Sequence, residues 1–188
     1  LVRSRGLGDV YKRQDEDRRI LGCAQPKFLY GINNIFSYKN FDLSFFFQGS
    51  YGNDIYNATR MFTEGMFDSR NQSDRVLMRW RNPGDYTTVP RAEKDKYPAI
   101  SSRFVEDGSY FKLKNVKLSY TLPRPLTRKA LMDRVTVYIS GDNLVTFTNY
   151  RGYDPEVNIG GGSSSAMGID QGVFPHARTY ILGATIVF

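Results

Sequence analysis

Apolar and polar residues alternate along five segments of this chain, with the two-residue period of β-strands. In the first segment Phe28, Tyr30 and Ile32 share one side, while Gly31 and Asn33 lie on the other. The expected strands cover residues 28–37, 41–50 and 110–122, a fourth strand that begins with residues 134–140, and residues 180–188. The chain is therefore expected to be all-β, and the short turn at residues 39–40 predicts that the first two strands form a hairpin.

The last expected strand has the most uniform face. Its side chains on that face are all apolar or aromatic: Tyr180, Leu182, Ala184, Ile186 and Phe188. An apolar strand edge invites aggregation unless another strand covers it, so this edge is expected to be paired. The final strand of a soluble β-sandwich and the closing strand of a membrane barrel both fit these nine residues.

The connections between the expected strands alternate in length. Two residues follow the first strand and about eleven follow the third, whereas about fifty and about twenty-five follow the second and fourth. Outer-membrane barrels have this asymmetry, with short periplasmic turns and long extracellular loops, and a soluble sandwich has no reason for it. Five strands are too few to close a membrane barrel, whose minimum is about eight. The sequence therefore predicts an antiparallel transmembrane segment that forms the C-terminal wall of a larger barrel.

The two long connections carry weaker signals. Residues 55–66 predict a short helix, and Pro, Gly and Asp favour turns in residues 79–91. The first connection, residues 52–105, is expected to contain no strand, a length that points to a functional loop or a lid. In the second connection, residues 149–175, the glycine and serine run at 160–165 is expected to be mobile rather than to cradle phosphate.

Composition removes several classes of function. The net charge is +7, but the basic residues are dispersed, so nucleic-acid binding is not expected. Cys23 and His176 are the only residues of their types, which excludes an internal disulfide and argues against a zinc site. No apolar run reaches the length of a membrane-spanning helix. Residues 1–14 follow no regular pattern and are expected to be a disordered or artefactual leader before a domain at residues 15–188.

Candidate binding residues are aromatic, and no catalytic residue, metal ligand or cofactor site is expected. Four rings in the first long connection are suited to stacking on sugars or to packing the loop on itself: Tyr56, Trp80, Tyr86 and Tyr97. Asp154 and Glu156 have the types of a glycosidase acid–base pair, but Pro155 between them favours a turn or a loop ion pair. The role of Arg178 stays open. Without a nucleophile–base pair or a metal cluster, the chain is not expected to be an enzyme.

A series of short motifs makes the chain resemble the SusC/RagA-type TonB-linked outer-membrane receptors. They are YKNFDLS at 38–44, QG at 48–49, GSYFKLKNV at 108–116, SGDNL at 140–144, GYDPE at 152–156 and FPHARTY at 174–180. Each motif is weak, and the order and spacing of the set are specific. The resemblance covers residues 15–188.

This resemblance implies a barrel of about 22 strands with an N-terminal plug. It also implies nutrient import, of glycans or peptides, in the outer membrane. The expected partners are outer-membrane lipid, a SusD-like lipoprotein that the loop aromatics would contact, the TonB complex through the missing N-terminal region, and the barrel-assembly machinery that reads the terminal strand. A calcium site near Asp15 to Asp17 stays open, as does the substrate. The alternative is a secreted β-sandwich that binds carbohydrate.

Overall fold

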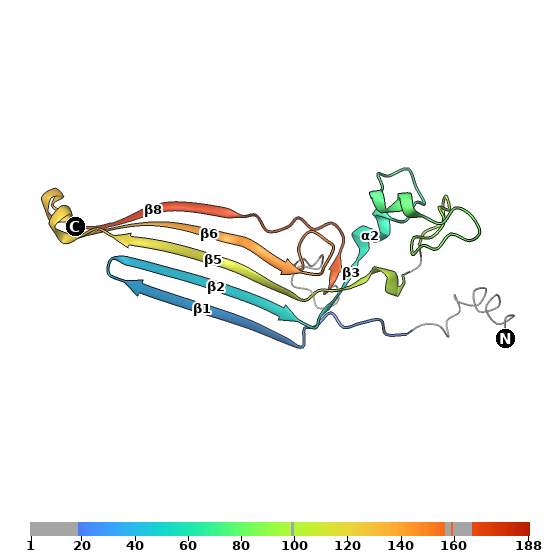
Figure 1. Ribbon diagram of the computed structural model, residues 1–188, viewed down its shortest axis with the longest axis horizontal. Helices are drawn as coiled ribbons and strands as arrows, with labels where there is room; N and C mark the ends of the chain where they lie inside the picture. Colours follow the sequence, from blue (N-terminus) through green and yellow to red (C-terminus); the bar gives the residue numbers. More distant parts are fainter. Residues whose placement is uncertain (1–18, 99, 157–158, 160–166) are drawn as a thin grey trace.

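The main element of the fold is one antiparallel sheet of five strands (Figure 1). A computed structural model describes residues 19–98, 100–156, 159 and 167–188. The strands are β1 (Phe28–Tyr38), β2 (Phe41–Tyr51), β5 (Tyr110–Thr121), β6 (Arg134–Thr148) and β8 (Thr179–Val187), in the order β1-β2-β5-β6-β8. Each strand pairs with the one before it in the main sheet, and the five predicted strands are thus confirmed.

The pairing register sorts the side chains onto two faces. One row runs straight across all five strands through Phe36, Leu43, Leu118, Ile139 and Leu182. The adjacent row on the other face is mostly small or polar: Ser37, Asp42, Ser119, Tyr138 and Gly183. The predicted alternation therefore gives the sheet one apolar face and one largely polar face, with register shifts at Phe46/Phe47 and at Leu113/Asn115.

The β1–β2 hairpin has the short turn that the sequence predicts. Its two turn residues are Lys39 and Asn40, and Lys39 takes a left-handed conformation with a φ of 54°. The Asn40 side chain donates a 2.6 Å hydrogen bond to the carbonyl oxygen of Thr121 at the end of β5. This contact ties the hairpin turn to the neighbouring strand.

The short connection between β5 and β6 contains α3 (Arg124–Thr127) and η4 (Arg128–Ala130). Both short connections lie at one end of the sheet, and the described residues of the two long segments, 52–98, 100–109, 149–156, 159 and 167–178, lie at the other (Figure 1). The predicted asymmetry of the connections is confirmed. In the part of the chain that the structure describes, no helix is long and apolar enough to cross a membrane.

One expectation about the long segments was wrong, and a second holds over shorter bounds. The first segment is not free of strands, because β3 (Asp54–Asn57) pairs with β4 (Val105–Asp107), and β7 (Ile169–Asp170) adds to β3 in parallel. The helix expected at residues 55–66 is shortened to α2 (Ala58–Thr63). The reason is tertiary, since Ile55 is buried in this small sheet and Asn57 caps the helix by accepting a 2.9 Å hydrogen bond from the Arg60 N–H.

The long segments form a layer with its own core at one end of the sheet. Its remaining short helices are η2 (Asp74–Met78) and η3 (Ser102–Phe104). Its buried apolar side chains are Ile55, Ala58, Phe67, Val89, Phe104 and Tyr150. The sheet itself contributes only Tyr110 and Val135 to the buried apolar residues among those the structure describes. This distribution separates an end layer with a packed core from a sheet whose apolar face has no second layer over it among the described residues.

Several expectations lie outside the described residues. They concern the leader at residues 1–14, the open calcium site near Asp15 to Asp17, and the mobile tip at residues 160–165.

Candidate functional site

The four aromatic residues expected to bind ligand do not form one platform. No ring contact joins any two of them in the described part of the chain. Tyr56 in β3 packs edge-on against Phe104, with ring centroids 6.3 Å apart, and burial raises the pKa of its hydroxyl. Tyr97 lies against Phe67 at 4.2 Å. These two rings contribute to the packing of the end layer, so a shared ligand platform stays a prediction without a geometric basis.

The other two aromatics differ in exposure. Trp80 is half-buried, and its backbone N–H donates a 3.0 Å hydrogen bond to the Val89 carbonyl. Tyr86 is fully exposed to solvent. The strand residues of the sequence prediction lie elsewhere: Tyr180, Leu182, Ala184 and Ile186 occupy the apolar face of β8, and Phe188 follows its last residue. The loop aromatics and the terminal strand thus belong to separate parts of the molecule.

A first group of charged side chains, here called the strand–loop cluster, joins β5 to the segment after β6. It consists of Lys112, Lys114, Asp154, Glu156 and His176. Nζ of Lys112 lies 3.1 Å from Oδ1 of Asp154 and 2.5 Å from Oε2 of Glu156, and this lysine is only 1% exposed. Lys114 Nζ lies 2.8 Å from the same Glu156 oxygen. The cluster therefore anchors a long loop to a strand through buried ion pairs.

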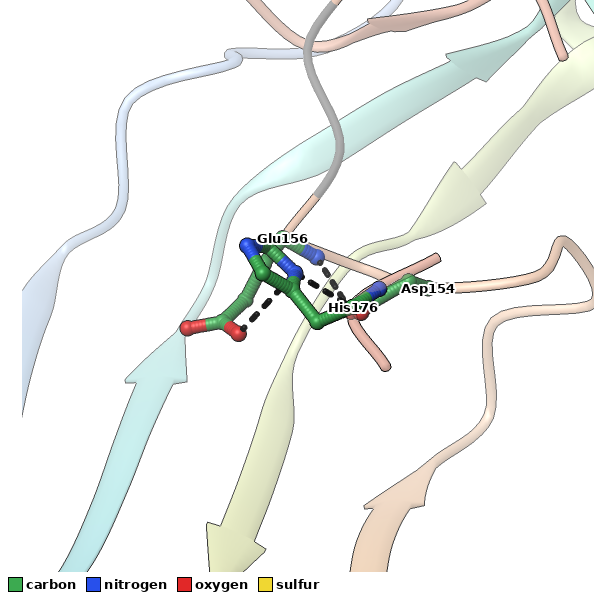
Figure 2. Close-up of side chains that lie close together, drawn as sticks. All are labelled: Asp154, Glu156 and His176. Atoms are coloured by element: carbon green, nitrogen blue, oxygen red, sulfur yellow. Dashed lines mark hydrogen bonds and ion pairs between the residues drawn. The ribbon is translucent and has the colours of Figure 1, made fainter. Parts of the chain in front are cut away.

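Figure 2 shows three members of this cluster close together. His176 Nδ1 lies 3.1 Å from Oδ2 of Asp154 and 3.9 Å from Oε2 of Glu156. Burial acts to raise the pKa of Asp154, but hydrogen bonds from the Glu156 N–H, Lys112 and His176 outweigh it, so the pKa falls below its ordinary value. Burial acts in the same way on Glu156, and hydrogen bonds from Lys112 and Lys114 again leave its pKa lowered. Both carboxylates are therefore held ionised.

The geometry invites comparison with a metal site, because one ligand atom from each of Asp154, Glu156 and His176 lies within 4.8 Å of the others. However, the Lys112 ammonium bridges the two carboxylates, and Lys114 adds a second positive charge. A divalent cation would have to displace a buried lysine and tolerate another, with few oxygen ligands in return. These residues fit a lysine counter-ion and do not fit a metal.

The prediction that Asp154 and Glu156 form a turn or an ion pair is confirmed. The Glu156 N–H donates a 3.0 Å hydrogen bond to Asp154 Oδ1, which is the turn, and the lysines supply the ion pairs. The ion-pair partners of the two carboxylates lie on a strand, β5, rather than on a loop as the sequence suggested. Lys112 and Lys114 were not singled out from the sequence, because lysine side chains on an alternating strand are ordinarily exposed to solvent.

A second group, the loop arginine cluster, is centred on Glu64 at the end of α2. Three guanidinium groups surround this carboxylate, which is 1% exposed: Arg60 Nε at 3.0 Å, Arg75 Nε at 3.2 Å and Arg103 Nη2 at 2.9 Å. Arg60 also pairs with Glu106 in β4. Burial acts to raise the pKa of Glu64, and the hydrogen bonds and charges of the arginines lower it overall. One carboxylate thus holds together three parts of the first long segment.

Comparisons with known proteins identify relatives of this chain. No protein-family model matches the chain. It is 40% identical over 177 residues to TonB-dependent receptor P3 of Formosa agariphila, covering 92% of this chain and 17% of that protein. It is 28% identical over 172 residues to TonB-dependent receptor SusC of Bacteroides thetaiotaomicron, covering 85% of this chain and 15% of the relative.

A solved structure has the same fold over most of the chain. The RagAB peptide importer in its closed-closed state superposes with a TM-score of 0.76 at 27% identity, over 89% of this chain and 18% of that one. The chain thus spans less than a fifth of the length of the proteins it matches. All three relatives are named as receptors or importers.

Proposed function

The chain belongs to the SusC/RagA-type TonB-dependent receptors, and from this premise we propose that it forms part of the wall of an outer-membrane β-barrel that imports nutrients. In this proposal the apolar face of the sheet contacts lipid and the polar face lines the lumen. The end layer lies on the extracellular side. The alternative, a secreted β-sandwich that binds carbohydrate, is not favoured by the relatives.

The observation that carries the proposal is the bare apolar face. Leu118, Ile139 and Leu182, neighbours in one row of the sheet, are 42%, 52% and 83% exposed. A soluble sandwich would cover such a row with a second sheet, but the three-stranded sheet β4-β3-β7 lies beyond one end of the strands (Figure 1). A contiguous apolar surface of this kind needs a partner, and lipid fits a face that spans every strand.

Aromatic rings at both ends of the apolar face support a membrane position. At the short-turn end Phe41 and Tyr120 have ring centroids 4.6 Å apart. At the other end Tyr30, Phe111 and Phe147 form a stacked series with centroids 6.1 and 6.3 Å apart. Along β1, the eight-residue step from Tyr30 to Tyr38, which pairs with Phe41, corresponds to about 27 Å. A tilted transmembrane β-strand needs about 9–11 residues, so the stretch from Tyr30 to Tyr38 is long enough for one crossing of the apolar band.

The sheet has two open edges, which the proposal explains. In the described residues β1 pairs only with β2, and β8 pairs only with β6. Strand edges without partners promote aggregation, and a barrel removes them by closure. Other strands of the receptor, in a barrel of about 22, are proposed to pair with both edges.

The proposed mechanism assigns no catalytic residue to this chain. The wall supplies polar lumen positions and the ion-paired end layer at the entrance. Energy is proposed to come from the TonB complex, and a SusD-like lipoprotein is proposed to cover the entrance, in contact with exposed loop residues such as Tyr86. The apolar side of β8, with Tyr180, Leu182, Ala184, Ile186 and Phe188, is proposed as the strand that the barrel-assembly machinery recognises.

Spin labelling of the two sides of β8 tests this proposal. In a full-length receptor carrying Cys23→Ser, nitroxides are attached at Leu182→Cys on the apolar face and at Thr185→Cys on the polar face. In reconstituted bilayers, oxygen, which concentrates in lipid, should relax the label at 182 more strongly. A water-soluble nickel complex should relax the label at 185 more strongly. A label at Leu131→Cys, in the short connection and 89% exposed, reports full water access.

Two results would contradict the proposal. One is equal access of the nickel complex to both labels, which would mean that neither face contacts lipid. The other is recovery of the intact receptor in the soluble fraction of the cell.

A further inference from the structure

The loop arginine cluster borders a cavity with more guanidinium groups than carboxylates. The cavity has a volume of about 450 Å³ and lies between α2, β4 and the segment that follows β6. Its charged lining consists of Arg60, Arg75, Arg103 and Arg151 against Glu64, Glu106 and Asp107. The wall of this cavity is therefore net positive.

The carboxylates are already engaged within the protein. Glu64 is shared by three arginines, and Glu106 pairs with Arg60 and accepts a 3.0 Å hydrogen bond from the Arg151 backbone N–H. The Asp107 carboxylate accepts hydrogen bonds from the Ser109 N–H at 2.9 Å and from its hydroxyl at 2.5 Å. Glu64 and Glu106 are thus held by arginines, and Asp107 is held by Ser109.

The guanidinium groups have N–H donors that the contacts described above do not use. Each arginine carries five N–H donors, more than the contacts above use. The Arg151 side chain is exposed and makes no hydrogen bond or ion pair with the described residues. Nε of Arg75 is buried and lies within ion-pair distance of Glu64, yet it makes no hydrogen bond in this part of the chain. Donors without acceptors at a positive cavity are the features that an oxyanion would satisfy.

A second cavity of about 700 Å³ continues from the first and shares Arg60, Arg75 and Arg151 with it. It also shares Glu64, and its other walls carry neutral polar side chains, among them Asn57, Gln72 and Ser73, and the exposed ring of Tyr153. The one further carboxylate, Asp170, is buried and accepts a hydrogen bond from the Tyr150 hydroxyl. The Asn57 side-chain amide nitrogen is buried and has no hydrogen-bond partner among the described residues. The second cavity thus adds neutral hydrogen-bonding groups beside the arginines that it shares with the first.

We propose that these two adjoining cavities bind a ligand through one carboxylate, which sits between Arg151 and Arg75 while the neutral remainder of the ligand occupies the second cavity. An acidic oligosaccharide and a short acidic peptide both carry this chemistry. The inference rests on the proposed function, because it names a ligand class for that receptor. If the arginines only stabilised the end layer, those around Glu64 would be sufficient. The side chain of Arg151 would then have no structural role.

The test is calorimetric binding to the full-length receptor in detergent micelles. The ligands are a trigalacturonate, an acidic tripeptide and the neutral trisaccharide maltotriose. Arg151→Gln should weaken binding of the acidic ligand about tenfold, the loss expected for one charge-assisted hydrogen bond. Arg128→Gln, a matched change in η4 at the opposite end of the sheet, should leave binding unchanged. Because Arg151 is exposed, its replacement should not disturb folding, and an unchanged melting temperature verifies this.

The pattern of results separates the outcomes. Binding of only one of the two acidic ligands supports the site and shows whether the acidic group is recognised on a sugar or on a peptide. Binding of the unmodified receptor should also weaken as salt rises, since a guanidinium that is open to solvent is screened. Equal affinity for maltotriose, no binding of either acidic ligand, or equal affinities of the two arginine variants would overturn the proposal. Binding in micelles requires neither import nor membrane location, so this failure is distinct from failure of the proposed function.

Discussion

Replacement of Glu64 by glutamine tests how the end layer is held together. The substitution keeps the size of the side chain and removes its charge, leaving three guanidinium groups beside a neutral amide. Their atoms lie 2.9 to 3.2 Å from the carboxylate oxygens. Removal of one partner from a buried ion pair costs about 3–5 kcal/mol.

The lower end of this range applies here. The three arginine side chains are 14%, 34% and 23% exposed, so water can recover part of their solvation, and Arg60 retains Glu106. We expect local opening of the end layer to become easier by about 3 kcal/mol, which corresponds to a factor of roughly 150 in the opening equilibrium.

Hydrogen exchange followed by mass spectrometry measures this opening in the full-length receptor. Peptides that cover residues 58–78 and 101–107 should exchange roughly 150 times faster in Glu64→Gln, while peptides from β5 and β6 keep their rates. Asp68→Asn is the matched control. Its partner Arg70 is 58% exposed, and exposed ion pairs contribute at most about 1 kcal/mol, so its peptides should change less than about fivefold.

Two outcomes would refute this reasoning. If Glu64→Gln changed exchange no more than Asp68→Asn, the arginines would not depend on the carboxylate for their placement. If the strands of the main sheet accelerated as much as the loops, Glu64 would stabilise the whole fold rather than the end layer.

Two further predictions concern the strand–loop cluster and β8. The pKa values of Asp154 and Glu156 are lowered in the folded protein, so their stabilisation is present above the ordinary values of 3.8 and 4.5 and is lost as pH falls through the lowered ones. A spin label at Tyr153 should therefore become more mobile as the pH falls below the ordinary values, and a spectrum that stays constant on acidification would count against the anchor. Replacing Phe188 by serine should reduce the outer-membrane level of the receptor severalfold, because a polar residue then interrupts the apolar side of the proposed recognition strand. Quantitative surface labelling measures this, and undiminished labelling would remove Phe188 from that role.

The sequence alone determined the main sheet. Alternation is a local property, and a register with period two fixes which side of a strand each residue takes. The row through Leu43, Leu118 and Leu182 was therefore implicit in the separate patterns of three strands. The two-residue turn after β1 and the contrast between short and long connections were equally visible, since both depend only on positions along the chain.

Only the tertiary structure decided the arrangement of the end layer. The strand β3 was missed because its four residues are stabilised by β4 and β7, which lie about fifty and more than one hundred residues away in sequence. The charged clusters depend on similar distances: 42 residues separate Lys112 from Asp154, and 39 separate Glu64 from Arg103. Whether a charge is solvated or buried against a partner is set by the fold around it, and no local pattern records that.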